Sequence, residues 1–321
     1  MKVVRKYQFE HCWFVGMLVG LIVLPWAVTF AFCPHAFAAY RTLHFSLILK
    51  ANLFSLAWGV ANLLCGLCFV RIGFALTGGI LTGLGISVGV TVPMVVKGSG
   101  LFSEAPSLNS AAGHAVLLGV AIMLAGVVLV TLAGFGRDRA LRQLERPSGN
   151  FGLGLIMAVV AGVLSVGMSF SFVYSQSPIV RAMQAQGAGD MPANFAVWAI
   201  ALLGGALINV LYPAYRMTRN RSWQVLRQSG AEGALASLIG VSLFAGAALL
   251  GKGMLLLGAL GASVGFGIQQ AAQMLGNQGV GFLGGEWRGV GGTPRLQMYI
   301  AICILIISVI ILGYGNTLAR F

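Results

Sequence analysis

The sequence predicts an all-α polytopic membrane protein, because long apolar runs recur along the chain and few charges interrupt them. Only 8% of the residues are charged and 58% are hydrophobic, and the mean hydropathy is +0.90. A soluble domain needs more polar groups to cover its surface. The runs have roughly the 20 apolar residues with which a helix crosses a bilayer. They also lack the alternation that is typical of membrane-spanning β-strands.

Nine such runs predict about nine transmembrane helices. Short basic, glycine-rich or proline-containing segments separate them. The predicted spans are residues 13–33, 45–70, 73–96, 114–135, 151–174, 194–215, 233–251, 254–283 and 297–316.

The distribution of positive charge predicts the orientation in the membrane. A net charge of +13 would favour nucleic-acid binding in a soluble protein. When successive loops between the predicted spans are assigned to alternate sides of the membrane, however, 14 of the 20 Lys and Arg residues fall on one side. The positive-inside rule therefore places the N-terminus in the cytoplasm and the C-terminus outside. We expect these loops to set topology and to contact anionic lipids, with no nucleic-acid partner. The larger group is Lys2, Arg5, Lys6, Arg71, Arg137, Arg139, Arg142, Arg146, Arg216, Arg219, Arg221, Arg227, Arg288 and Arg295.

Glycines spaced by four residues predict close packing between helices. Small residues at this spacing share one helix face and let two backbones approach each other. Such helices can also slide or rock, as alternating access requires, although static packing explains any single pair equally well. The pairs are Gly79/Gly83, Gly85/Gly89, Gly261/Gly265 and Gly281/Gly285.

No motif predicts an enzyme, a metal site or a cofactor. The segments 85–89 and 261–265 fit the nucleophile-elbow pattern, but they lie inside apolar helices rather than at a strand–turn–helix junction. The sequence has no metalloprotease or P-loop fingerprint, and no Gly-x-Gly-x-x-Gly motif that opens a soluble domain. The five cysteines lie mostly within spans, where packing is the default role. The four histidines fall near span ends, so we expect them to be solvated at the interface.

Uncharged polar side chains at membrane depth are the candidate binding residues. Trp58 and Asn62 share one helix face, because they are spaced at i and i+4. Amides buried in lipid are costly unless they are partnered, so they either hold helices together or bind a ligand. A neutral polyol such as a sugar would use amides for its hydroxyls and an aromatic ring for its apolar face. The other candidates are Asn209 and, on one face of the eighth span, Gln270, Gln273 and Asn277, with Ser165, Ser169 and Ser171 in the fifth span.

Several blocks of the sequence resemble the L-rhamnose–proton symporter family of the drug/metabolite transporter superfamily. Their order and spacing match over nearly the whole chain. The resemblance implies two five-helix inverted repeats and uptake of a deoxysugar driven by a cation gradient. The blocks are Leu24-Pro25-Trp26-Ala27 after Glu10, Trp58-Gly59-Val60-Ala61-Asn62, Ser165-Val166-Gly167-Met168-Ser169-Phe170, Gly204-Gly205-Ala206-Leu207-Ile208-Asn209 and Glu286-Trp287.

The resemblance also implies a domain division and a missing helix. We expect residues 1–150 to form the first repeat with four spans and residues 151–321 to form the second repeat with five. In the family, a further spanning helix precedes the segment that resembles residues 2–10 here. Either the start codon was placed too late in the gene, or this member works with four helices in its first repeat and five in its second. We favour a late start, because a lone four-helix half would leave a lipid-facing gap.

Proton coupling rests on the resemblance rather than on visible chemistry. None of the seven acids lies at mid-membrane by sequence position. We expect Glu286 to carry the proton, because apolar surroundings raise the pKa of a carboxyl group. The alternative is that Glu286 caps the cytoplasmic end in a pair with Arg288. Glu10 is a second candidate.

Together these features predict a secondary active transporter that imports L-rhamnose or a similar deoxysugar by proton symport. It would be a multi-pass protein of the bacterial inner (plasma) membrane, with the sugar, the proton and the bilayer as its partners. Trp58 would stack on the sugar, and Asn62, Asn209, Gln270, Gln273 and Asn277 would bond its hydroxyls. The alternatives are a superfamily transporter of another small metabolite and a non-transporting membrane sensor or assembly subunit.

Overall fold

The computed structural model describes residues 5–96, 106–141, 151–257 and 264–318, and all regular structure within them is helical. This confirms the predicted all-α fold. The chain divides into two compact units. Unit 1 comprises Met1–Leu63 and Gly167–Gly253, and unit 2 comprises Leu64–Val166 and Met254–Phe321. We describe each unit by itself.

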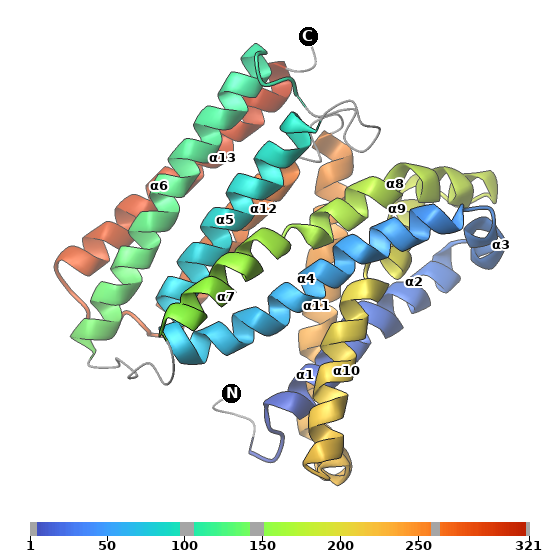
Figure 1. Cartoon of the computed structure of the whole chain (residues 1–321), viewed down its shortest axis with the longest axis horizontal. Coiled ribbons are helices and arrows are strands. Elements are labelled where there is room, and N and C mark those ends of the chain that lie inside the picture. The colour runs from blue at the N-terminus through green and yellow to red at the C-terminus, as the bar shows by residue number, and fades with distance from the viewer. Residues whose placement is uncertain (1–4, 97–105, 142–150, 258–263, 319–321) are drawn as a thin grey trace. The chain divides into compact units, whose positions relative to one another are not determined.

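Unit 1 contains the N-terminal helices and the middle of the chain (Figure 1). Its first two helices are joined by a π-helical turn at Val19–Val23. Pro25 follows this turn, and in a regular α-helix its ring would crowd the carbonyl of Leu21 four residues earlier. A π-turn accommodates such a clash without ending the helix. The helices are α1 (Phe9–Leu18), α2 (Leu24–Phe32), α3 (Ala36–Arg41), α8 (Gly167–Ala185), α9 (Asp190–Ala201) and α10 (Leu203–Arg219), with parts of α4 (Phe45–Ile72) and α11 (Gly230–Leu257).

Glycines bring α1 and the π-turn into backbone contact with α11. A Cβ atom on Gly20 would lie 2.7 Å from the Gly240 carbonyl oxygen. A Cβ atom on Gly240 would collide with the Gly16 carbonyl oxygen. Helices pack this closely in membranes only where no side chain intervenes.

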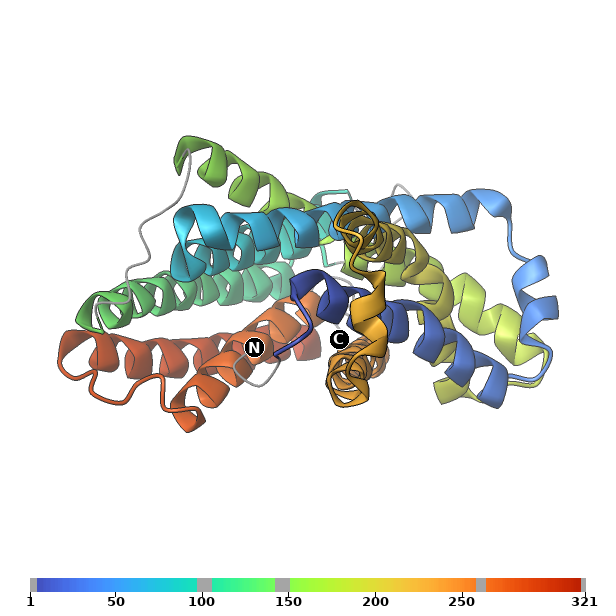
Figure 2. The ribbon, with the colours of Figure 1, turned by 90° about the horizontal axis from the view of Figure 1, so that it is seen from below.

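Unit 2 is built around the pair α6 (Ala111–Ala140) and α13 (Thr293–Leu318), which run side by side in both views (Figures 1 and 2). The hydroxyl of Ser110 caps α6 by accepting a hydrogen bond from Gly113 N at 3.0 Å. Buried side chains from α6 and α13, including Met123 and Leu305, form the core. The remaining helices are α5 (Phe74–Val95), α7 (Phe151–Leu164) and α12 (Val264–Leu283).

The predicted close contacts are confirmed for Gly79 and Gly89 of α5, but the prediction is wrong for Gly281/Gly285, because α12 ends at Leu283 and Gly285 lies in the following turn with a φ of +77°. A Cβ atom on Gly89 would lie 2.6 Å from the Phe266 ring, and one on Gly79 would collide with the Thr131 hydroxyl. Ser87 lies inside α5, where its hydroxyl bonds the Gly83 carbonyl at 2.9 Å, so the Gly-x-Ser-x-Gly pattern is helical as expected. Gly261 lies outside the described residues.

Seven helices in the described residues are long and apolar enough to cross a membrane. A bent pair, α9 with α10, would make eight. Large apolar side chains such as Leu249, Leu283 and Ile310 are exposed on the protein surface, where lipid would cover them. The predicted span 254–283 begins inside α11 and includes residues 258–263, which are not described. The count of nine therefore stays a prediction.

We predict that Gly240→Ala destabilises the protein by about 1–3 kcal/mol, because the added methyl group must push α11 away from α1. The matched control is Gly246→Ala on the same helix, where a Cβ atom would meet nothing within 4 Å. Thermal unfolding in detergent measures both variants. Equal midpoints for the two variants would contradict the close contact.

Candidate functional site

The bend between α9 and α10 organises the polar side chains of unit 1. The two helices meet at Leu202 with an angle of 48°. A bend frees backbone carbonyls at the end of one helix and backbone N–H groups at the start of the next. In a membrane these groups must be bonded by the protein.

Neighbouring helices supply the bonds at this bend. The Ser171 hydroxyl of α8 donates to the Ala201 carbonyl at 3.0 Å. On α4, the Asn52 amide oxygen accepts from Gly204 N at 2.6 Å, and the Ser55 hydroxyl accepts from Gly205 N at 2.9 Å. The start of α10 is therefore capped by α4 rather than by its own residues.

Trp58 and Asn209, two predicted substrate ligands, both lie at this joint. Trp58 is 9% exposed, and its ring occupies the space that a side chain at Gly205 would need. Asn209 is 2% exposed, and its amide donates to the Gly205 carbonyl at 2.9 Å and accepts from the Trp13 indole at 3.2 Å. Both side chains thus contribute to helix packing in this structure.

Asn62 lies one turn beyond Trp58 on α4. It is half-buried, and none of the hydrogen bonds found among the described residues involves its amide. Its amide is therefore available to a ligand, whereas the Asn209 amide is bonded within the protein.

The remaining predicted ligands lie in unit 2. Gln270 is half-buried, and its amide nitrogen and the Ser165 hydroxyl both lie beside Gly85 of α5. A Cβ atom on Gly85 would lie 3.4 Å from the Gln270 nitrogen and 2.9 Å from the Ser165 oxygen. Gln273 and Asn277 are exposed along the same helix. The adjacent Gln269 has a buried amide oxygen without a partner among the described residues. The structure thus joins Gln270 with Ser165, and it divides the predicted ligands between two units.

Glu286 forms an ion pair with Arg137 rather than with Arg288. The Arg137 guanidinium lies 2.8 Å from the Glu286 carboxylate and 2.9 Å from that of Asp138. It also lies over the Trp287 ring, 5.6 Å from the centroid. The Glu286 side chain is 60% exposed, whereas that of Arg137 is 18% exposed.

A buried polar cluster lies where α1 meets the end of α10. His11 was expected to be solvated, but its side chain is 0% exposed, so that expectation is wrong. One ring nitrogen lies 3.1 Å from Gln8 N and the other lies 3.1 Å from the Ser222 carbonyl. Because both ring nitrogens find partners, burial costs the ring little. Glu10 is also buried, and Asn220 donates to its carboxylate at 3.0 Å.

Glu232 binds the segment that precedes α1. Its carboxylate accepts hydrogen bonds from the backbone N–H groups of Arg5, Lys6 and Tyr7, at 3.0, 3.1 and 2.7 Å. Burial raises the pKa of the Tyr7 phenol, which donates to the Leu226 carbonyl at 2.9 Å. The Glu232 carboxylate therefore has a structural role that its position in the sequence did not indicate.

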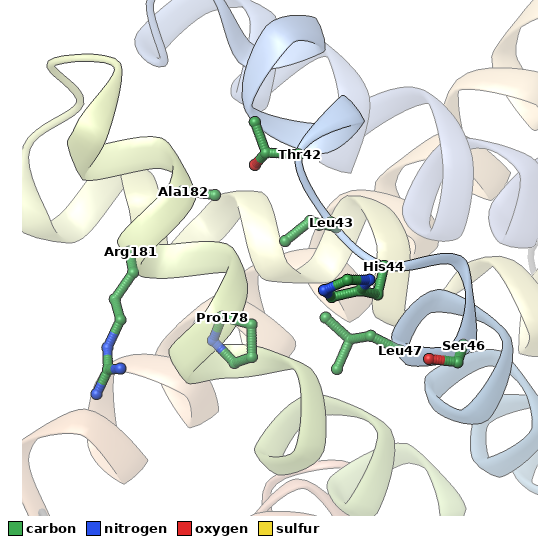
Figure 3. Close-up of a pocket in the computed structure, with 8 residues that line it drawn as sticks. All are labelled: Thr42, Leu43, His44, Ser46, Leu47, Pro178, Arg181 and Ala182. Atoms are coloured by element: carbon green, nitrogen blue, oxygen red, sulfur yellow. The ribbon is translucent and has the colours of Figure 1, made fainter.

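A surface pocket of about 490 Å³ lies between the α3–α4 connection and α8 (Figure 3). It contains none of the predicted ligands. His44 and Arg181 are its basic side chains, and both are exposed. In Figure 3 the Arg181 side chain extends away from His44, so the two groups do not converge on one ligand.

Comparison with known proteins assigns the family. Residues 1–318 match the family described as the L-rhamnose-proton symport protein. The chain is a member of this family. It is therefore a multi-pass protein of the bacterial inner membrane, in agreement with its apolar helices.

Individual relatives carry the same name. A protein of Shigella boydii serotype 18 and one of Escherichia coli strain 55989 are each 32% identical over 218 residues, and one of Escherichia coli strain SMS-3-5 is 31% identical. All three are called L-rhamnose-proton symporter. The match covers 68% of this chain and 62% of each relative.

Sequence reasoning missed Asn52 and Ser55. The available signal was two polar side chains at i and i+3, one turn before Trp58 in an otherwise apolar span. Their partners on α10 could not be read from the sequence.

We predict that Ser55→Ala lowers stability by about 1–3 kcal/mol, because the buried Gly205 N–H loses its acceptor. Ser242→Ala is the control, since the Ser242 hydroxyl bonds only its own helix, at the Leu238 carbonyl on an exposed face. Thermal midpoints of the purified variants provide the comparison. If Ser55→Ala unfolds at the temperature of the unsubstituted protein, the capping of α10 by α4 is not needed for stability.

Proposed function

We propose that this protein imports L-rhamnose, or a deoxysugar of similar shape, together with protons. The observation that carries the proposal is the family match over residues 1–318. The all-helical fold with several apolar helices supports a transporter rather than an enzyme.

We further propose nine spans arranged as inverted repeats, with residues 1–150 and 151–321 as the repeats. The bent pair α9–α10 and the interrupted pair α7–α8 support this architecture. Transporters of this kind place substrate sites beside such discontinuous helices. The two compact units describe packing rather than repeat symmetry, so they do not bear on this division.

Within this function, we propose Asn62, Gln270, Gln273 and Asn277 as the amides that bond sugar hydroxyls. Asn62 and Gln273 suit this role, because their amides take part in none of the hydrogen bonds found among the described residues. Trp58 and Asn209 lie where α4 packs against α10. They would contact the sugar only when this contact between the two helices rearranges.

Uptake by right-side-out membrane vesicles tests the function. Labelled L-rhamnose should accumulate when the outside is acidic, and a protonophore should abolish the accumulation. D-Mannitol, a polyol without the ring, serves as the control solute. No accumulation of L-rhamnose above vesicles without the protein would contradict the proposal.

We predict that Asn62→Ala and Gln273→Ala each weaken sugar binding by about 1–3 kcal/mol, or roughly 5- to 150-fold, because a sugar hydroxyl loses its partner. Folded yield should change little, since neither amide takes part in a hydrogen bond within the part of the chain that the structure describes. Counterflow of labelled L-rhamnose and size-exclusion profiles measure the two properties. Parallel losses of yield and transport would instead make these residues structural.

We predict that Glu286→Gln uncouples sugar movement from the pH gradient and leaves sugar exchange intact. Glutamine keeps the size and hydrogen bonding of the side chain but cannot titrate. Asp138→Asn is the matched control, because Asp138 contacts the same Arg137 guanidinium. Gradient-driven accumulation is compared with counterflow in vesicles. Unchanged accumulation in Glu286→Gln would remove this residue from the coupling mechanism.

A further inference from the structure

Three buried polar atoms in the described residues of unit 1 have no hydrogen-bond partner, and all three lie on α8 or α9. They are the Ser169 hydroxyl, the Asn194 amide nitrogen and the Trp198 indole nitrogen. Their side chains are 1%, 1% and 0% exposed. Buried donors without acceptors cost free energy, so their concentration on one helix pair calls for an explanation.

The three side chains belong to two helix faces that pack against each other. Phe172 of α8 stacks on Trp198 of α9, with ring centroids 4.3 Å apart. One turn further, the Gln176 amide donates to the Asn194 amide oxygen at 2.9 Å. Ser169 precedes Phe172 by three residues and therefore lies on the same face of α8.

These contacts fix the direction of two of the unpaired donors, those of Asn194 and Trp198. Because the Asn194 oxygen accepts from Gln176, its NH₂ group is the free end of the amide. The stacking on Phe172 fixes the plane of the Trp198 indole. Gly251 of α11 packs at the indole edge, where a Cβ atom would lie 2.9 Å from the nitrogen.

The chemistry of the donors identifies what they recognise. Two N–H groups and one hydroxyl can donate to oxygen acceptors, and the two N–H groups cannot coordinate a cation. Residues 169–176 and 194–201 include no charged side chain, so the surroundings do not favour an anion. A neutral ligand rich in hydroxyl oxygens fits both conditions.

We propose that Ser169, Asn194 and Trp198 bind hydroxyl oxygens of the sugar between α8 and α9. This assignment rests on the proposed function, because it names further contacts for the same substrate. The spacing of Asn194 and Trp198 at i and i+4 is that of Trp58 and Asn62, with the amide and the indole exchanged.

The assignment has an unusual consequence for stability. Removing a donor that bonds only the ligand should weaken binding without destabilising the ligand-free protein. A residue with a purely structural role would behave in the opposite way. Ser169→Ala removes one oxygen atom, and Trp198→Phe keeps the ring stack on Phe172 but removes the N–H group.

The experiment measures L-rhamnose affinity by titration calorimetry and the ligand-free thermal midpoint, both on the purified full chain. We expect Ser169→Ala and Trp198→Phe each to weaken binding by about 2- to 12-fold. The ligand-free midpoint of Ser169→Ala should be unchanged or higher. Ser175→Ala and Trp26→Phe are the controls, because the Ser175 hydroxyl bonds its own helix at 2.7 Å and Trp26 packs against Tyr40. Both controls should bind as the unsubstituted protein does.

The outcomes separate this assignment from the proposed function. If the unsubstituted protein binds L-rhamnose and both variants bind it equally well, the function stands and the assignment is wrong. A lowered ligand-free midpoint of Ser169→Ala without any loss of affinity would show that ordered water already satisfies this hydroxyl, which also overturns the assignment. If the unsubstituted protein does not bind L-rhamnose, the proposed substrate is wrong and the assignment fails with it.

Discussion

Lipid offers no hydrogen bonds, so the backbone groups freed at Leu202 must be bonded by the protein. Unit 1 is arranged around this requirement. Ser171 bonds the last carbonyl of α9, while Asn52 and Ser55 bond the first N–H groups of α10. These bonds tie α4 and α8 to the bent pair. The bend would be unstable without them, and the close packing of Trp58 on Gly205 depends on the same joint.

The fold class and most helices could be predicted from the sequence, because length and apolarity identify a spanning helix without knowledge of its neighbours. The roles of polar residues could not. Asn209 has an amide that could bond a sugar, yet this amide bonds the Trp13 indole and the Gly205 carbonyl. His11 lies near a span end, yet its side chain is buried and its ring nitrogens are bonded by Gln8 and Ser222. Whether an amide is available for a ligand depends on contacts that no sequence pattern encodes.

Glycine explains how two helices can approach closely enough for such polar contacts to form. Where α1 meets α11, the backbones at Gly20 and Gly240 leave no room for a Cβ atom. On α11, Gly251 likewise leaves the edge of the Trp198 indole free of a side chain. Close helix approach and an unpartnered donor thus occur beside the same residue type. In a membrane, where apolar burial does not drive association between helices, this contact geometry provides much of the packing energy.

Proton coupling requires a carboxylate that can lose its partners without a large cost. Glu232 accepts three backbone N–H groups, so protonation would weaken three hydrogen bonds at once. Glu10 is buried and bonded by Asn220. Glu286 differs, because its partner Arg137 is also paired with Asp138. When Glu286 takes up a proton, Arg137 therefore keeps a negative partner and its contact with Trp287. Of these three acids, Glu286 can change its charge with the least disturbance of the surrounding structure, which supports its proposed role as the proton carrier.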